Sequence, residues 1–180
     1  MAANPANPAA QAPDEEQSPL ERFGRDLTEI AELGKLTDSL FEAKDRYWSE
    51  QVDVQRMGLM AWTALAEGNR DEALDLMKKT ADAEDATDKS PITPGPLTPA
   101  RELFGDMLLQ LGKPGEALAQ YEATLKKEPN RFRATFGAAK AAAASGDAAK
   151  AKARYAELLK IAADGDRPVL AQARQFLAAN

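Results

Sequence analysis

Two segments of the chain repeat each other at a spacing of 34 residues. The matching positions are Gly112, Ala117 and Tyr121 in the first segment and Gly146, Ala151 and Tyr155 in the second. A looser third copy lies upstream at an offset of 44, so about ten extra residues separate it from the next copy. A period of this length predicts helical hairpins that stack side by side and bury a continuous core between neighbours.

The composition favours an all-α fold. Eleven alanines lie between Ala134 and Ala153, and alanine is the best helix former. β-branched residues are scarce, and 180 residues are enough for one domain with a buried core. We therefore expect a superhelix of three helical hairpins, preceded by one helix and closed by a C-terminal capping helix.

The missing residue types exclude several classes of chemistry. The chain has no cysteine and no histidine, which removes disulfides, thiolate zinc sites, the usual general base and the commonest metal ligand. A carboxylate-based enzyme such as a glycoside hydrolase would need paired acids in a deep cleft, which stacked hairpins seldom build. We therefore expect no enzymatic activity, no metal and no cofactor.

Charge and hydropathy limit the partners. A net charge of −6 argues against a nucleic-acid partner, because a phosphate backbone requires a basic surface. No apolar run approaches the roughly 18–20 residues of a membrane-spanning helix, and none follows Met1 as a signal peptide would. We therefore expect neither nucleic-acid binding nor membrane insertion.

The chain divides into a tail and a repeat domain. Residues 1–19 contain four prolines and few apolar side chains, so we expect a disordered tail followed by one helical domain over residues 20–180. The tail resembles a linker left after removal of an export signal and equally a cytosolic extension, so the compartment stays open. The expected hairpins span about 47–82, 98–127 and 132–163, and the capping helix spans about 167–178.

Local signals predict where the helices begin and end. Asn69 with Glu72 three residues later reads as a capping box. Thr98 is the expected N-cap of the next helix, with Pro99 in its first turn. Residues 83–97 carry three prolines and a glycine, which predicts an irregular loop between the first two hairpins.

The order of small and large residues resembles that of the tetratricopeptide repeat (TPR) family over residues 54–163. Small residues occupy the expected helix crossings, namely Gly105, Ala117, Ala139 and Ala151, and large ones such as Tyr121 fill the space between hairpins. The resemblance implies a helical superhelix whose first helices line a concave face. TPR proteins commonly hold extended peptides on that face.

A narrower resemblance links the chain to the C-terminal region of long, largely uncharacterised bacterial TPR proteins. It rests on Tyr47-Trp48, Glu84-Asp85, Thr93-Pro94-Gly95-Pro96, Pro99-Ala100-Arg101-Glu102-Leu103 and Glu128-Pro129-Asn130-Arg131-Phe132. Those proteins are rich in histidine in their N-terminal parts. Where they commonly place histidine before the first loop proline, this chain has Ser90, so no metal or catalytic role transfers to this position.

The repeat register identifies candidate partner-binding residues on the concave side. They are Trp62 from the first unit, Glu102, Asp106, Leu109 and Gln110 from the second, and Arg133, Phe136 and Lys140 from the third. Trp62 would either anchor a partner or pack under the loop or against the N-terminal helix. The asparagines that a TPR protein needs to clamp a terminal carboxylate are absent.

Arg101 follows the proline-rich loop and has two interpretations. It would either bind a ligand carboxylate at the mouth of the groove or act as a clasp that hydrogen-bonds loop carbonyls, and we favour the clasp. Four methionines at helical spacing are core residues in our interpretation rather than ligands for Cu(I).

The sequence thus predicts a non-enzymatic module that binds a partner peptide or protein on its concave face. The alternative is a non-catalytic module related to a larger histidine-rich TPR protein that binds metal or another ligand. The identity of the partner and the oligomeric state stay open.

Overall fold

The computed structural model describes residues 19–87, 96–163 and 165–179, and all regular structure within these ranges is helical. The helices are α1 (Pro19–Glu42), α2 (Arg46–Ala66), α3 (Arg70–Ala86), α4 (Ala100–Gln110), α5 (Pro114–Lys127), α6 (Phe132–Ala144), α7 (Ala148–Ile161) and α8 (Pro168–Ala179). Within these ranges, no helix combines the length and apolarity that crossing a membrane requires. The expected disordered tail falls mainly on residues 1–18, which lie outside the described ranges.

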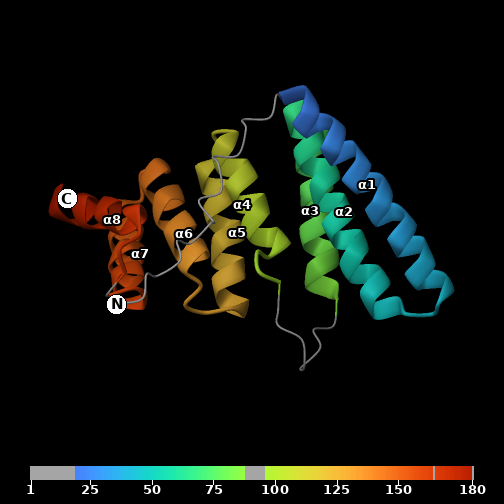
Figure 1. Cartoon of the computed structure of the whole chain (residues 1–180). Helices are drawn as coiled ribbons and strands as arrows, with labels where there is room; N and C mark the ends of the chain where they lie inside the picture. The colour runs from blue at the N-terminus through green and yellow to red at the C-terminus, as the bar shows by residue number, and fades with distance from the viewer. Residues whose placement is uncertain (1–18, 88–95, 164, 180) are drawn as a thin grey trace, which may run out of the picture.

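Three antiparallel hairpins form the body of the molecule (Figure 1). They are α2–α3, α4–α5 and α6–α7, each packed against the next. Helix α1 packs against α2 at one end of the array, and α8 packs against α7 at the other end and lies across it in Figure 1. The expected all-α array of helical hairpins with a C-terminal capping helix is confirmed.

Each hairpin turns on a glycine in the left-handed region. Gly68, Gly112 and Gly146 have φ angles of 89°, 73° and 84°. A residue with a Cβ atom is strained at these angles, whereas glycine adopts them readily. The three glycines therefore end the first helices and allow the second helices to return alongside them.

Two of the expected helix caps are wrong in detail. Helix α4 begins at Ala100 with Pro99 at the N-cap position, so Thr98 does not cap it. Instead, the Glu84 Oε2 atom accepts a hydrogen bond of 2.7 Å from the Ala100 N–H group. Asn69 does occupy the N-cap position of α3, but its side chain makes no capping bond there and donates to Glu67 instead.

The start of the interhairpin loop also differs from expectation. Helix α3 continues to Ala86, so Ala83 and its neighbours are helical rather than part of the loop. The first proline after α3 is Pro91, and the alanines and acidic residues at positions 83–86 are compatible with an α-helix.

Tyr121 is the central residue of the junction between the second and third hairpins. It is fully buried, and its ring lies against the backbone of Gly105 on α4 and Gly137 on α6. A Cβ atom built on Gly105 would lie 2.8 Å from Tyr121 Cζ, closer than real carbon contacts allow. The two glycines therefore leave the space that the tyrosine ring fills.

Substitutions at Ala117 and Ala151 test whether the repeat requires small residues at these positions. Both are fully buried, so Ala117→Leu and Ala151→Leu should each destabilise the fold by about 1–3 kcal/mol through overpacking. Thermal unfolding followed by circular dichroism measures the loss. The exposed change Lys126→Gln is the control and should shift the free energy of unfolding by less than about 0.5 kcal/mol. Equal effects from all three variants would contradict the repeat register.

Candidate functional site

An open groove lies between the first helices of the second and third hairpins. Its volume is about 460 Å³. Its lining residues are Asp106, Leu109 and Gln110 from α4 and Lys140 and Ala144 from α6. The sequence register had placed all but Ala144 on the concave side, and the structure brings them together around one opening. Ala144 lies 34 residues after Gln110, so the same register contained the signal for it.

Asp106 holds one side of the groove in place through two hydrogen bonds. Its Oδ1 atom accepts a hydrogen bond of 2.5 Å from the Tyr121 hydroxyl, and its Oδ2 atom accepts one from Arg133. Burial raises the pKa of Tyr121 well above its usual value, and the bond to Asp106 raises it further. The hydroxyl is therefore a neutral donor that fixes the orientation of the Asp106 carboxylate.

Arg133 lies between two carboxylates. Besides its bond to Asp106, its Nε atom lies 3.1 Å from Glu102 Oε1. The arginine side chain is 53% exposed, so solvent reaches it, but its charge is already balanced by two acids. Arg133 therefore supports the groove wall and adds little net positive charge to it.

The expectation that Glu102 faces the groove is corrected by its burial. Its side chain is 0% exposed, and its Oε2 atom lies 3.1 Å from Arg131 Nε. Burial raises the pKa of Glu102, while the bond from Arg131 acts in the opposite direction. The two arginines of the following repeat draw this carboxylate inward, so it joins α4 to α6 instead of facing a partner.

Lys140 supplies the positive charge of the groove. It is exposed, and its Nζ atom lies 5.6 Å from the centroid of the Phe136 ring. Within the described ranges, no carboxylate is ion-paired with Lys140. Phe136 itself is half-buried and meets Tyr155 edge to face, with ring centroids 6.4 Å apart. The ring thus supports the lysine and is largely occupied by core packing.

Arg101 joins three helices. It donates hydrogen bonds to Asp85 at 2.5 Å and Asp82 at 2.7 Å on α3, and to Gln120 at 2.8 Å on α5. These contacts describe a clasp, but its partners are side chains rather than the expected loop carbonyls. A loop carbonyl is instead bound by Arg131, which donates a hydrogen bond of 2.7 Å to Leu97 O.

Trp62 lies away from the groove lining. It is half-buried and packs against the main hydrophobic core, so its role in binding a partner stays a prediction.

Arg131 was not identified from the sequence as a residue that joins neighbouring segments. Its contacts are with positions 29 and 34 residues away, which no local pattern reveals. The described residues contain no group of three or more acidic side chains arranged to hold a metal ion.

Comparison with known families identifies the repeat. Residues 108–177 match the family model for the tetratricopeptide repeat. No curated protein matches the sequence significantly.

Solved structures show the same arrangement of helices. PcrH from Pseudomonas aeruginosa shares 19% identity at a TM-score of 0.55, over 71% of this chain and 90% of PcrH. The first TPR of Spaghetti (RPAP3), bound to the HSP90 peptide SRMEEVD, shares 17% identity at a TM-score of 0.54, over 70% of this chain and 91% of that one.

The structure of MamA from Desulfovibrio magneticus RS-1 is similar over a larger part of this chain. It shares 12% identity at a TM-score of 0.55, over 84% of this chain and 82% of that one. At such identities the likeness concerns the fold. The family match confirms the expected TPR repeat over residues 108–177, and the solved structures confirm the TPR-like fold. The narrower resemblance to long bacterial TPR proteins stays a prediction.

Proposed function

We propose that this chain is a non-enzymatic interaction module that holds an extended segment of a partner protein in the groove between α4 and α6. The observation that carries the proposal is the groove itself. It combines apolar Leu109 and Ala144, the amide of Gln110 and the exposed cation of Lys140 within one opening of about 460 Å³. Extended peptides need such a mixture of apolar contact and a few placed polar groups.

Each lining residue suits a different part of a peptide. Leu109 and Ala144 offer apolar surface to a side chain of the partner. The Gln110 amide both donates and accepts hydrogen bonds, which suits a peptide backbone. Lys140 is available to an acidic side chain, whereas Arg133 is already engaged by Asp106 and Glu102. The groove therefore favours a segment with one acidic residue near an apolar one.

The rigid wall beside the groove supports the same proposal. Tyr121, Asp106 and Arg133 are joined by hydrogen bonds, so little side-chain freedom is lost when a partner binds against them. Preorganisation of this kind lowers the entropic cost of association.

Two structural neighbours have been solved with bound protein segments. The first TPR of Spaghetti holds an HSP90 peptide, and PcrH has been solved in complex with the chaperone binding region of PopB. These complexes support an interaction role for a chain of the same fold. They leave the partner of this chain to be identified.

A charge reversal at Lys140 tests the proposal. The wild-type chain, Lys140→Glu and Lys126→Glu are used as baits in extracts of the source cell, and captured proteins are compared by quantitative mass spectrometry. We expect a partner that is lost with Lys140→Glu and kept with Lys126→Glu. Both variants change the net charge equally, but Lys126 is exposed on α5, outside the groove.

The affinity of a peptide from that partner then gives a quantitative result. In isothermal titration calorimetry, we expect Lys140→Glu to lower the affinity for the peptide at least tenfold and Lys126→Glu to change it less than twofold. Equal weakening by both variants would show a non-specific charge effect and contradict binding in the groove.

A further inference from the structure

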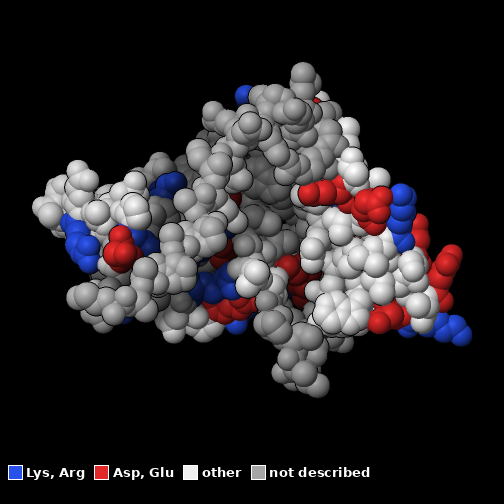
Figure 2. All heavy atoms as spheres, in the orientation of Figure 1, with Lys and Arg blue, Asp and Glu red and all other residues white. Residues whose placement is uncertain are grey.

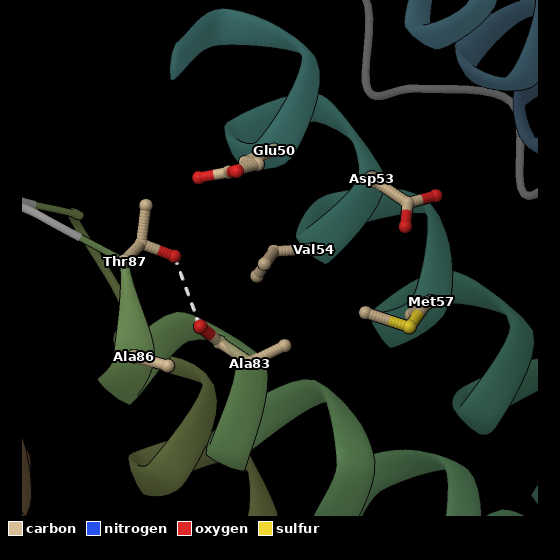
Figure 3. A pocket seen from close by; sticks show the side chains of 7 residues that line it. All are labelled: Glu50, Asp53, Val54, Met57, Ala83, Ala86 and Thr87. Carbon is tan, nitrogen blue, oxygen red and sulfur yellow. Dashed lines mark hydrogen bonds between the residues drawn. The ribbon is translucent and has the colours of Figure 1, made fainter. Parts of the chain in front are cut away.

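A second pocket lies within the first hairpin and shares no lining residue with the α4–α6 groove. Glu50, Asp53, Val54 and Met57 of α2 line it together with Ala83, Ala86 and Thr87 at the end of α3. Val54 lies at the centre of the opening, with Glu50 and Thr87 on two sides of it (Figure 3). The floor is thus apolar, and part of the rim is acidic.

The volume limits what the pocket accepts. It is about 240 Å³, below the roughly 300–1,000 Å³ of pockets that hold drug-sized ligands. A single aliphatic side chain, presented by a partner, suits this space and its Val54, Met57 and Ala83 surface. A larger ligand would extend over the rim and meet Glu50.

Glu50 is available to a partner. Among the described residues, Glu50 is ion-paired with Arg46 alone, one turn earlier, and the Glu50 and Arg46 side chains are 45% and 85% exposed. Exposed pairs of this kind exchange easily, because water screens both charges. Asp53 is held more firmly by Arg56, at 2.6 Å with both side chains about one-third exposed. Glu50 is therefore the carboxylate that a bound cation would reach.

The surrounding charge distribution favours a basic partner. Residues 27–87 carry 14 acidic and 7 basic side chains, whereas residues 96–180 carry 9 acidic and 13 basic ones. Acidic side chains gather over the α1–α2 end of the molecule in Figure 2. The net charge of −7 around the pocket attracts a cationic segment, and the field of opposite charges raises its rate of association.

We propose that the pocket between α2 and α3 is a second docking site, which takes an aliphatic side chain next to a lysine or arginine from a basic segment of another protein. The aliphatic side chain contacts Val54 and Met57, and the neighbouring cation pairs with Glu50. This site is independent of the α4–α6 groove, where the exposed Lys140 favours an acidic segment instead of a basic one.

A methyl resonance inside the pocket provides a direct test. The protein is labelled with ¹³C at its methionine methyl groups and titrated with the peptide Gly-Lys-Leu-Lys-Gly, and separately with Gly-Glu-Leu-Glu-Gly. We expect the lysine peptide alone to shift the Met57 signal in a saturable way. The signals of Met77 and Met107, which are fully buried elsewhere, serve as internal references.

A matched pair of variants separates the pocket from general charge attraction. Glu50→Lys should lower the affinity for the lysine peptide at least tenfold, whereas Asp75→Lys should lower it less than twofold. Asp75 is also exposed and also paired within its own helix, with Lys79, but it lies on α3 outside the pocket lining. Equal weakening by the two variants overturns the proposal.

Other occupants give different results. If residues 88–95, which follow Thr87, fill the pocket, neither peptide shifts the Met57 signal. If a second copy of this chain fills it, the Met57 signal moves with protein concentration alone and Glu50→Lys stops that movement. Either result overturns the proposal that the pocket binds a basic segment of another protein. Neither result affects the test of Lys140.

Discussion

Gly137→Ala should destabilise the protein, although alanine is a better helix former than glycine. A Cβ atom at position 137 would overlap the Tyr121 ring, with Cζ only 2.5 Å away. The ring is fully buried and is hydrogen-bonded at its far end to Asp106, so it has little room to move. The overlap should cost about 1–3 kcal/mol, more than the gain of about 1 kcal/mol in helix propensity.

Gly58→Ala is the matched control for this prediction. Gly58 also lies inside a helix and is also buried, but a Cβ atom there would meet Thr80 Cγ2 at 3.7 Å, an ordinary contact. This variant should therefore keep its free energy of unfolding or gain up to about 1 kcal/mol. Thermal unfolding of both variants checks the prediction, and a stabilised Gly137→Ala protein would contradict the packing of Tyr121.

Arg101→Ala should weaken the attachment of the first hairpin to the second. The substitution removes hydrogen bonds to Asp82, Asp85 and Gln120 from a side chain that is only 17% exposed. Bonds between charged groups contribute about 1.5–3 kcal/mol, but Asp82 is 48% exposed and solvent screening reduces its share. We expect a total loss of about 2 kcal/mol at neutral pH, measured by denaturant unfolding.

The pH dependence of this variant provides a second check. Hydrogen bonds from Lys78 and Arg101 lower the pKa of Asp82 below 3.8. Burial alone would raise the pKa of Asp85, but bonds from Lys127 and Arg101 outweigh it and lower that pKa as well. Since both folded pKa values lie below the unfolded ones, their stabilisation is full above about pH 4 and is lost as the pH falls through the folded values.

The difference between wild type and Arg101→Ala should therefore shrink below about pH 4. Lys126→Gln should show no such convergence, because Lys126 forms no ion pair with either aspartate in the described structure. A difference in stability that stays constant from pH 7 to pH 3 would contradict the clasp.

The fold could be predicted because the repeat depends on a few residue sizes at fixed spacing. Small residues such as Ala117 allow two helices to cross, and left-handed glycines such as Gly112 end a helix whatever surrounds them. Both signals are local or recur at 34 residues. They do not depend on knowing which side chains meet.

The register also predicted the groove residues Asp106, Gln110 and Lys140, because a helix position fixes the direction of a side chain. It could not predict the burial of Glu102, which depends on two arginines from the next repeat. The partners of Arg101 could not be predicted either, because the extra residues before Pro99 shift α3 relative to the 34-residue period. Burial and ion pairing are properties of the assembled hairpins.

We propose that Lys140 pairs with an acidic side chain of the partner in the α4–α6 groove. An exchange of the two charges across the interface provides a direct test of this contact. In the partner peptide, the acidic residue is replaced by lysine, and its dissociation constant is measured against wild type and Lys140→Glu. We predict that the exchanged peptide binds wild type at least tenfold more weakly and regains most of that affinity with Lys140→Glu. Binding that stays equally weak with Lys140→Glu would show that Lys140 does not contact this residue of the partner.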